Sequence, residues 1–221
     1  MLLGDLRAQV SDTCRALGRA GLIGTAGNLS VREGDLVVVS PSGIPPNELG
    51  PELVGVHRFD GSAVEAQAQP SSELPFHLAI YNRLPVGAIV HTHAPASTAL
   101  SALVDEVPGT HYYTALFGGP LRVARYATVG TDQLADRVAA ALDERRAALM
   151  ANHGAITIGS SLPEAAHLVS YLEYICEVQL RALSTGLPVR TLPPAELDRV
   201  AERLRGYSQD PPEPDLVDDP R

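Results

Sequence analysis

Three histidines in the chain are placed so that they could bind one metal ion. His91 and His93 are separated by one residue at the end of GAIVHTHA, an apolar stretch that predicts a buried strand. Side chains at positions i and i+2 of a strand point to the same face, so both imidazoles can reach one point. His153 lies in Asn-His-Gly between two further apolar segments, where it could supply a third imidazole. Three histidines and an open fourth position are the ligand arrangement of catalytic zinc sites.

These residues alone do not decide whether the protein binds a metal, because a His-x-His pair also occurs in proteins that bind none. The other four histidines have no comparable setting: two fall within predicted helices, where a packed or solvated histidine is the usual case. These four are His57, His77, His111 and His167.

Small polar residues form three candidate sites for a phosphate group. Pro70-Ser71-Ser72-Glu73 opens a predicted helix with Ser72 as its N-cap. The first N–H groups of a helix are unpaired and its dipole is positive there, so these groups and two hydroxyls could seat an anion. The segments 27–30 (GNLS) and 40–43 (SPSG) flank a predicted hairpin and offer further donors. Each segment could equally be an ordinary cap or turn, and the chain has no Walker or Rossmann motif.

The chain contains no lysine, since all 17 of its basic residues are arginine. Carbonyl chemistry through a lysine Schiff base is therefore excluded. If the protein polarises a carbonyl group, a metal ion or hydrogen-bond donors must do so.

The elements that would position these residues alternate along the chain. Helical and two-residue periodicities predict an α/β fold, in which helices flank a mixed or antiparallel sheet. The expected helices cover residues 3–20, 72–82, 95–104, 132–146, 163–184 and 195–206, and the expected strands lie in two hairpins (29–40 and 54–66), at 87–94, at 122–130 and on both sides of 152–154.

Charge and composition restrict the partners. The formal net charge is −9, of which the last fourteen residues contribute −4, so the rest of the chain carries only −5. This balance argues against nucleic acid or an anionic membrane as a partner, and no apolar run is long enough to span a bilayer. The N-terminus lacks the features of a signal peptide, and Cys14 and Cys176 fit buried free thiols, which indicates a cytoplasmic protein. We expect one domain over 1–207 and a disordered acidic, proline-rich tail over 208–221.

Six motifs together resemble one known family. GNLS, SPSG, PSSE, HTH, YATVGT and NHG occur in the order and at spacings similar to those of the class II aldolase and adducin-head family, over residues 5–207. The resemblance implies a three-layer α/β/α fold, a bound zinc or another divalent ion, and a lyase that cleaves a small ketose phosphate such as L-fuculose 1-phosphate through an enediolate. It also implies a homotetramer with active sites between subunits.

The resemblance assigns roles to individual residues. His91, His93 and His153 match the family's metal ligands, and Glu73 matches its acid–base carboxylate, which can also bind the metal. Burial is expected to raise the pKa of Glu73 when no metal holds it. Tyr112 matches the tyrosine that protonates the aldehyde oxygen, although Tyr113 is adjacent, and Tyr207 matches one that reaches the site from a neighbouring chain. The phosphate-binding positions correspond to Asn28, Ser42, Gly43, Ser71 and Ser72.

The sequence does not decide the substrate, because two positions differ from the aldolase motifs and several related activities fit the chain. Thr92 and Asn152 stand where the aldolase commonly has Asn and His, although neither is a metal position. A sugar-phosphate 4-epimerase of this family carries Asp at the position of Glu73, which favours the aldolase, whereas a dehydratase and a decarboxylase fit the chain about equally well. An adducin-like assembly module needs no metal ligands.

One apolar segment of the sequence indicates that subunits associate, independently of the family resemblance. Leu116-Phe117-Gly118-Gly119 follows a tyrosine pair and would expose apolar surface in a monomer. We therefore expect a subunit interface to cover this segment.

Overall fold

The structure of the protein is a computed structural model, and it describes residues 1–205. Tyr207 and the predicted disordered tail lie outside the described residues. The helices are α1 (Gly4–Arg19), α2 (Leu74–Arg83), α3 (Pro95–Ser101), α4 (Asp132–Ala141), α5 (Leu162–Ser184) and α6 (Pro194–Arg205), with 3₁₀ helices η1 (Pro46–Glu48), η2 (Pro51–Leu53) and η3 (Tyr112–Phe117). The strands are β1 (Asn28–Glu33), β2 (Leu36–Val39), β3 (Gly55–Arg58), β4 (Ala63–Glu65), β5 (Ala88–Thr92), β6 (Glu106–Val107), β7 (Leu121–Ala124), β8 (Ala147–Met150) and β9 (Gly154–Gly159).

The described strands form one sheet in the order β4-β3-β2-β1-β5-β9-β8-β7-β6. All neighbours pair antiparallel except β7 and β8, which are parallel. The predicted mixed, largely antiparallel sheet is therefore confirmed. Strand β5 lies near its centre, between β1 and β9, so both faces and both edges of β5 are buried.

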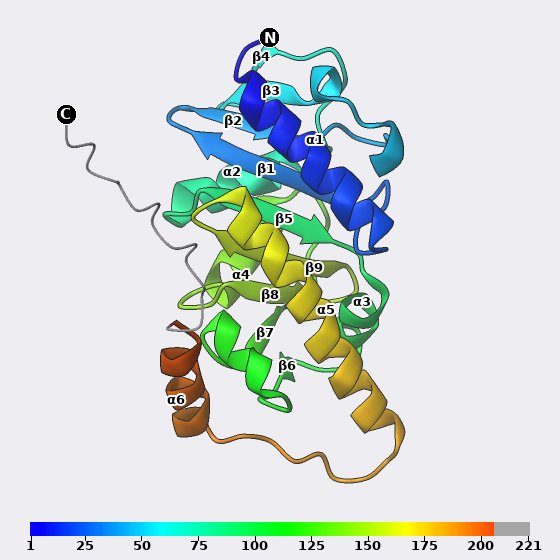
Figure 1. Cartoon of the computed structure of the whole chain (residues 1–221), viewed down its shortest axis with the longest axis vertical. Coiled ribbons are helices and arrows are strands. Elements are labelled where there is room, and N and C mark those ends of the chain that lie inside the picture. Colours follow the sequence, from blue (N-terminus) through cyan, green and yellow to red (C-terminus); the bar gives the residue numbers. More distant parts are fainter. Residues whose placement is uncertain (206–221) are drawn as a thin grey trace, which may run out of the picture.

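Helices cover both faces of this sheet, which confirms the three-layer α/β/α fold (Figure 1). The central strands are apolar on both faces and sort their side chains by alternation. In β2, Val37 and Val39 pack with α2 and α4, whereas Val38 packs with α1 and α5. In β1, Leu29 and Val31 also point to the α1 and α5 layer. The opposite face of β1 is polar and points towards α2.

Four predicted boundaries are wrong, and the first is the end of α3, which lies at Ser101 and not at residue 104. Helix α2 begins at Leu74 with Glu73 at its N-cap, so Ser72 does not cap it. Helix α4 ends near Leu142 instead of residue 146, because Glu144 takes a positive φ of 56° and Arg146 N–H bonds to the carbonyl of Phe117. Of the predicted strand at 122–130, only residues 122–124 are strand, as part of β7, and the remaining residues form a loop.

The prediction that Leu116–Gly119 would expose apolar surface in a single chain is also wrong. This segment ends η3, and Phe117 is fully buried in the core of its own chain beside α3 and α5. It therefore leaves no large apolar surface that needs a second subunit.

The two cysteines are buried and free, as predicted. Burial raises the pKa of the Cys14 thiol to about 12 and also raises the pKa of Cys176, so both remain protonated. Within residues 1–205, no helix combines the length and the apolarity that a bilayer crossing requires.

Candidate active site

Strand β5 and the turn between β8 and β9 bring the three histidines together. His91 lies in β5 and His93 directly follows it, so the two imidazoles point to one side. The turn at Ala151–His153 joins β8 to β9, and β9 pairs with β5, so His153 arrives beside them. The ring centroids of the three histidines lie 4.7–5.0 Å apart. Their predicted convergence is therefore present in the structure.

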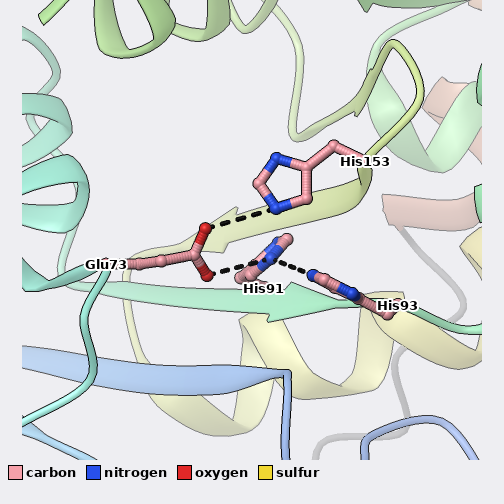
Figure 2. Close-up of side chains that lie close together, drawn as sticks. All are labelled: Glu73, His91, His93 and His153. Carbon is pink, nitrogen blue, oxygen red and sulfur yellow. Dashed lines mark hydrogen bonds and ion pairs between the residues drawn. The ribbon is translucent and has the colours of Figure 1, made fainter. Parts of the chain in front are cut away.

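Glu73 reaches the same point from the start of α2 (Figure 2). Its Oε2 atom lies 3.1 Å from His91 Nε2, and its Oε1 atom lies 3.2 Å from His153 Nε2. His93 Nε2 lies 2.8 Å from His91 Nε2. One ligand atom from each of the four residues falls within 4.8 Å of the others. We call this group the His₃Glu cluster.

The donors and acceptors of the His₃Glu cluster fit a cation. His91 Nδ1 lies 2.9 Å from the carbonyl oxygen of Ala155, which can only accept, so the proton of the neutral ring is on Nδ1. The Nε2 atom of His91 then faces another imidazole and a carboxylate, and a proton or a metal ion must lie between these atoms to hold them together. Such an arrangement is unfavourable without a positive charge between the acceptors. It matches a metal-ligating histidine whose second nitrogen is fixed by a backbone carbonyl.

The turn that carries His153 depends on its neighbours in Asn-His-Gly. Asn152 has a φ of 55°, a left-handed conformation that asparagine tolerates better than most residues. A Cβ atom on Gly154 would lie 2.5 Å from the carbonyl oxygen of Thr92. Only glycine therefore lets β9 approach the end of β5 closely enough for His153 to join the cluster.

The pKa of Glu73 moves in the direction opposite to the expected one. Burial alone would raise it, but hydrogen bonds from His153, His91 and Asn28 outweigh this effect and hold the pKa well below its usual range. The expectation of a raised pKa is wrong because the cluster surrounds the carboxylate with donors. Burial and the neighbouring His91 and His153 lower the pKa of His93 to about 4, so this imidazole is neutral at physiological pH and free to bind a metal.

The His₃Glu cluster opens into a cavity of about 590 Å³. Glu73, His93 and His153 line it, whereas His91 is fully buried behind them. All of the residues predicted to bind phosphate line the same cavity, namely Asn28, Ser42, Gly43, Ser71 and Ser72. Three segments that are far apart in the sequence thus offer hydroxyl and amide groups to one volume beside the cluster.

The donors available for an anion differ from those expected at a helix start. The Glu73 N–H bonds to Ser71 Oγ, and the Leu74 N–H bonds to the Ser71 carbonyl. Within residues 1–205, the N–H groups of Ser72 and Gly43 donate to no protein atom. Gly43 has a φ of 70°, which favours glycine, and it lines the cavity.

Asn28 contacts Glu73 as well as the cavity. Its Nδ2 atom donates to Glu73 Oε2 over 2.7 Å, and its side chain is 2% exposed. The sequence pattern did not indicate this bond, since the two residues are 45 positions apart.

The predicted catalytic tyrosine is not part of this cavity. Tyr112 lies in η3, is 43% exposed and packs against His111 and Tyr113. Tyr113 in turn contacts Tyr171 and Tyr174 of α5. Within one chain, neither Tyr112 nor Tyr113 lines the cavity that contains the His₃Glu cluster.

Two segments of the cavity wall were assigned no role from the sequence. Thr25 and Ala26 precede β1, and 126–129 follow β7. Tyr126 and Val129 are both more than half exposed at this cavity. The YATVGT motif contains the second segment, so its presence among the six motifs was the available signal.

Comparisons with known proteins agree with this geometry. The family described as Class II Aldolase and Adducin N-terminal domain matches residues 8–180. The chain is 37% identical over 213 residues to a 5-deoxy-D-ribulose 1-phosphate aldolase of Bacillus thuringiensis, covering 95% of this chain and all of that protein. It is 40% identical over 205 residues to a 5-methylthioribulose-1-phosphate/5-deoxyribulose-1-phosphate aldolase of Rhodospirillum rubrum, covering 91% and 92%.

The fold is similarly close to a solved structure of an L-fuculose 1-phosphate aldolase. The TM-score is 0.87 at 35% sequence identity, and the match covers 93% of this chain and 98% of that chain.

Proposed function

Because the chain belongs to the class II aldolase and adducin N-terminal domain family, we propose that it is a metal-dependent aldehyde-lyase that cleaves a ketose 1-phosphate by a retro-aldol reaction. The observation that carries this proposal is the shared cavity. It is lined by members of the His₃Glu cluster and also by Gly43 and Ser72, whose N–H groups donate to no protein atom within residues 1–205. A sugar phosphate needs both, since its carbonyl must be polarised while its phosphate is held.

The substrate class follows from what the relatives' names share. Each names a ketose 1-phosphate, with a deoxy or methylthio group at the far end of the named pentoses. Cleavage of any of these sugars between C3 and C4 releases dihydroxyacetone phosphate and a short aldehyde. We propose that this chain acts on a sugar of this type, L-fuculose 1-phosphate or a 5-deoxypentulose 1-phosphate.

The proposed metal is zinc, with other divalent ions as substitutes. His91, His93, His153 and Glu73 would hold it, and imidazole and carboxylate ligands suit zinc well. When bound, the ion supplies Lewis-acid stabilisation of the negative charge that develops on the substrate oxygens.

Glu73 is the proposed proton carrier at carbon. Breaking the C3–C4 bond leaves its electron pair on the three-carbon fragment, and C3 must then take up a proton. Glu73 lies at the edge of the cavity and is oriented by Asn28, so it can deliver this proton and remove it in the reverse direction. Asn28, Ser42, Gly43, Ser71 and Ser72 are the proposed phosphate-binding residues.

As the C3–C4 bond breaks, the C4 hydroxyl becomes an aldehyde and loses its proton, which must pass to a second group of the protein. We propose that Tyr112 and Tyr207 supply this group from a neighbouring subunit, since Tyr112 is exposed and does not line the cavity of its own chain. The corresponding assembly is a homotetramer with shared sites. Residues 1–207 would form its single domain, and we expect it in the cytoplasm.

A product assay with a panel of ketose phosphates tests the proposed function. Purified protein with one zinc per chain should release dihydroxyacetone phosphate and an aldehyde from at least one ketose 1-phosphate. Exhaustive chelation should abolish this activity, and added zinc should restore it. An epimerised, dehydrated or decarboxylated product would instead identify one of the related reactions. Full activity after chelation would contradict the metal-dependent reaction.

A further inference from the structure

Strand β1 presents a polar face to helix α2, whereas the neighbouring strand β2 presents Val37 and Val39 on the same side of the sheet. Leu29 and Val31 point to the apolar layer beneath α1 and α5. Asn28 and Ser30 alternate with them and therefore point to the opposite face, towards α2. Both polar side chains are at most 2% exposed. A strand buried on both faces would normally carry apolar residues at these positions.

Three polar residues of α2 and its N-cap, spaced four residues apart, contact this polar face of β1. Glu73, His77 and Tyr81 lie at positions i, i+4 and i+8, so they follow one side of the helix and its N-cap. Ser30 Oγ lies 2.6 Å from His77 Nδ1 and 2.8 Å from the Tyr81 hydroxyl. One turn earlier, Asn28 Nδ2 lies 2.7 Å from Glu73 Oε2. Two strand residues thus hold three residues of α2.

We call the contact of Asn28 and Ser30 with Glu73, His77 and Tyr81 the β1–α2 seam. Its residues are better suited to fixing the position of α2 than to packing a core. His77 is fully buried, and its Nε2 atom has no hydrogen-bond partner within residues 1–205. Leaving a buried polar atom unpaired destabilises a fold, so an apolar residue would serve packing better. Satisfied buried hydrogen bonds, in contrast, define one arrangement of two elements more sharply than apolar contacts do. Burial lowers the pKa of His77 to about 3, so its ring stays neutral.

We propose that Ser30, His77 and Tyr81 are positioning residues that fix the first two turns of α2 against β1 and thereby hold the Glu73 carboxylate at the three histidines. The proposal rests on the proposed role of Glu73. Helix α2 begins directly after Glu73, and His77 N–H bonds to the Glu73 carbonyl. A shift of α2 along β1 therefore moves Glu73 with it, while the histidines stay on β5 and the β8–β9 turn.

The test combines zinc affinity with the kinetics of proton transfer. The variants are Ser30→Ala, Tyr81→Phe and the pair His77→Leu and His77→Asn, in which Asn retains a polar atom near the position of Nδ1. Ser11→Ala is the matched control, because Ser11 is fully buried in α1 and its hydroxyl bonds only locally to Ala8. Zinc affinity is measured by competition with a chelator. Proton transfer is measured as kcat and as exchange of the C3 proton of dihydroxyacetone phosphate with D₂O.

Loss of the outer partners of a metal ligand typically weakens metal affinity or activity by ~10–100-fold. We expect a loss in this range for Ser30→Ala, Tyr81→Phe and His77→Leu in zinc affinity and in the exchange rate, with KM changed by less than about 3-fold because the phosphate seat is untouched. His77→Asn should recover part of the loss, and Ser11→Ala should show none. If Ser30→Ala does not fold, Tyr81→Phe and His77→Asn carry the test.

Wild-type zinc affinity and exchange rate in the seam variants would overturn the proposal, even if their thermal stability falls. Failure of the proposed function looks different. In that case the wild-type protein cleaves no ketose phosphate, while zinc affinity still reports on the seam. If only the seam proposal is wrong, Glu73→Gln is inactive and the seam variants are not.

Discussion

The proposed function gives Glu73 two roles, metal ligand and proton carrier. Its carboxylate lies within 3.2 Å of two imidazole nitrogens, and Asn28 holds it from the other side. An anionic ligand and a proton carrier make different demands, since the first must stay ionised and the second must be protonated during turnover. The low pKa of Glu73 without a metal shows that the surrounding donors favour the ionised form.

Replacing Glu73 with Gln separates these roles. Gln is nearly isosteric and can still accept a hydrogen bond from Asn28, but it cannot carry the proton. We expect turnover to fall by ~10²–10⁴-fold, as is typical for loss of a general base. Glu177→Gln, an exposed glutamate on α5, is the matched control. The measurements are kcat and zinc content. Unchanged turnover would place the base elsewhere, and a collapse of zinc content would make Glu73 chiefly a ligand.

His93 is the histidine whose role is easiest to isolate. It is the exposed member of the His₃Glu cluster, so truncation should disturb the core little. We expect His93→Ala to lower zinc from about one per chain and to abolish activity, because only two of the three imidazoles remain. His167→Ala, on the surface of α5, should retain both. Elemental analysis after gel filtration checks this prediction, and a full zinc complement in His93→Ala would contradict it.

At the scale of elements, the site depends on how closely β9 approaches β5. Thr92 pairs with Ala155, and the carbonyl of Thr92 occupies the space where a side chain on Gly154 would lie. The clash involves backbone atoms, which cannot rotate away as a flexible side chain can. Any relief must therefore move β9 or the turn that carries His153.

Gly154→Ala should therefore destabilise the fold and the site together. Overpacking of this kind typically costs ~1–3 kcal/mol, which should appear as a lower Tm and as weaker zinc binding. Gly24→Ala is the matched control, since a Cβ atom there meets nothing within 4 Å. Thermal unfolding and zinc titration of both variants test this. An unchanged Tm in Gly154→Ala would mean that the turn adjusts without strain.

The loops after β2 and before α2 should make the protein selective for phosphorylated sugars. Gly43 and Ser72 offer unpaired N–H groups, and the hydroxyls of Ser42 and Ser72 add further donors. Hydrogen bonds to a charged group contribute ~1.5–3 kcal/mol each, so we expect kcat/KM for the free sugar to fall by at least ~100-fold. Comparing the two forms of the sugar measures this. Equal kinetics would leave these loops as ordinary turns.

At the scale of the whole molecule, one chain leaves the proposed site incomplete. The His₃Glu cluster and the proposed phosphate-binding residues line one cavity. Tyr112 lies outside this cavity, in η3, where it packs against other aromatic residues. The apolar segment 116–119 does not support an interface, because Phe117 is buried in its own chain. The case for shared sites thus rests on the exposure of Tyr112 and on the family.

Mixed assembly tests whether sites are shared. A chain with His93→Ala and a chain with Tyr112→Phe should each be nearly inactive alone. After dissociation and reassembly together, we expect part of the activity to return, since some interfaces then pair an intact His₃Glu cluster with an intact tyrosine. Size-exclusion chromatography should give the mass of a tetramer. No recovery, with subunit exchange demonstrated by labelled chains, would argue that each chain contains its whole site.

The local parts of this protein are determined by its sequence. Alternation along β5 places His91 and His93 on one side, a property of a strand that needs no tertiary information. The buried cysteines and the order of helices and strands also follow from local periodicity, and six short motifs identify the family.

Only the tertiary structure decided how distant residues meet. Glu73 and His153 lie 18 and 62 positions from His91 in the sequence, and sheet order and helix packing alone bring them to it. The bonds of Asn28 and Ser30 to α2, the low pKa of Glu73 and the burial of Phe117 all depend on neighbours far along the chain. Electrostatics and burial are properties of the assembled environment, so local sequence patterns do not contain them.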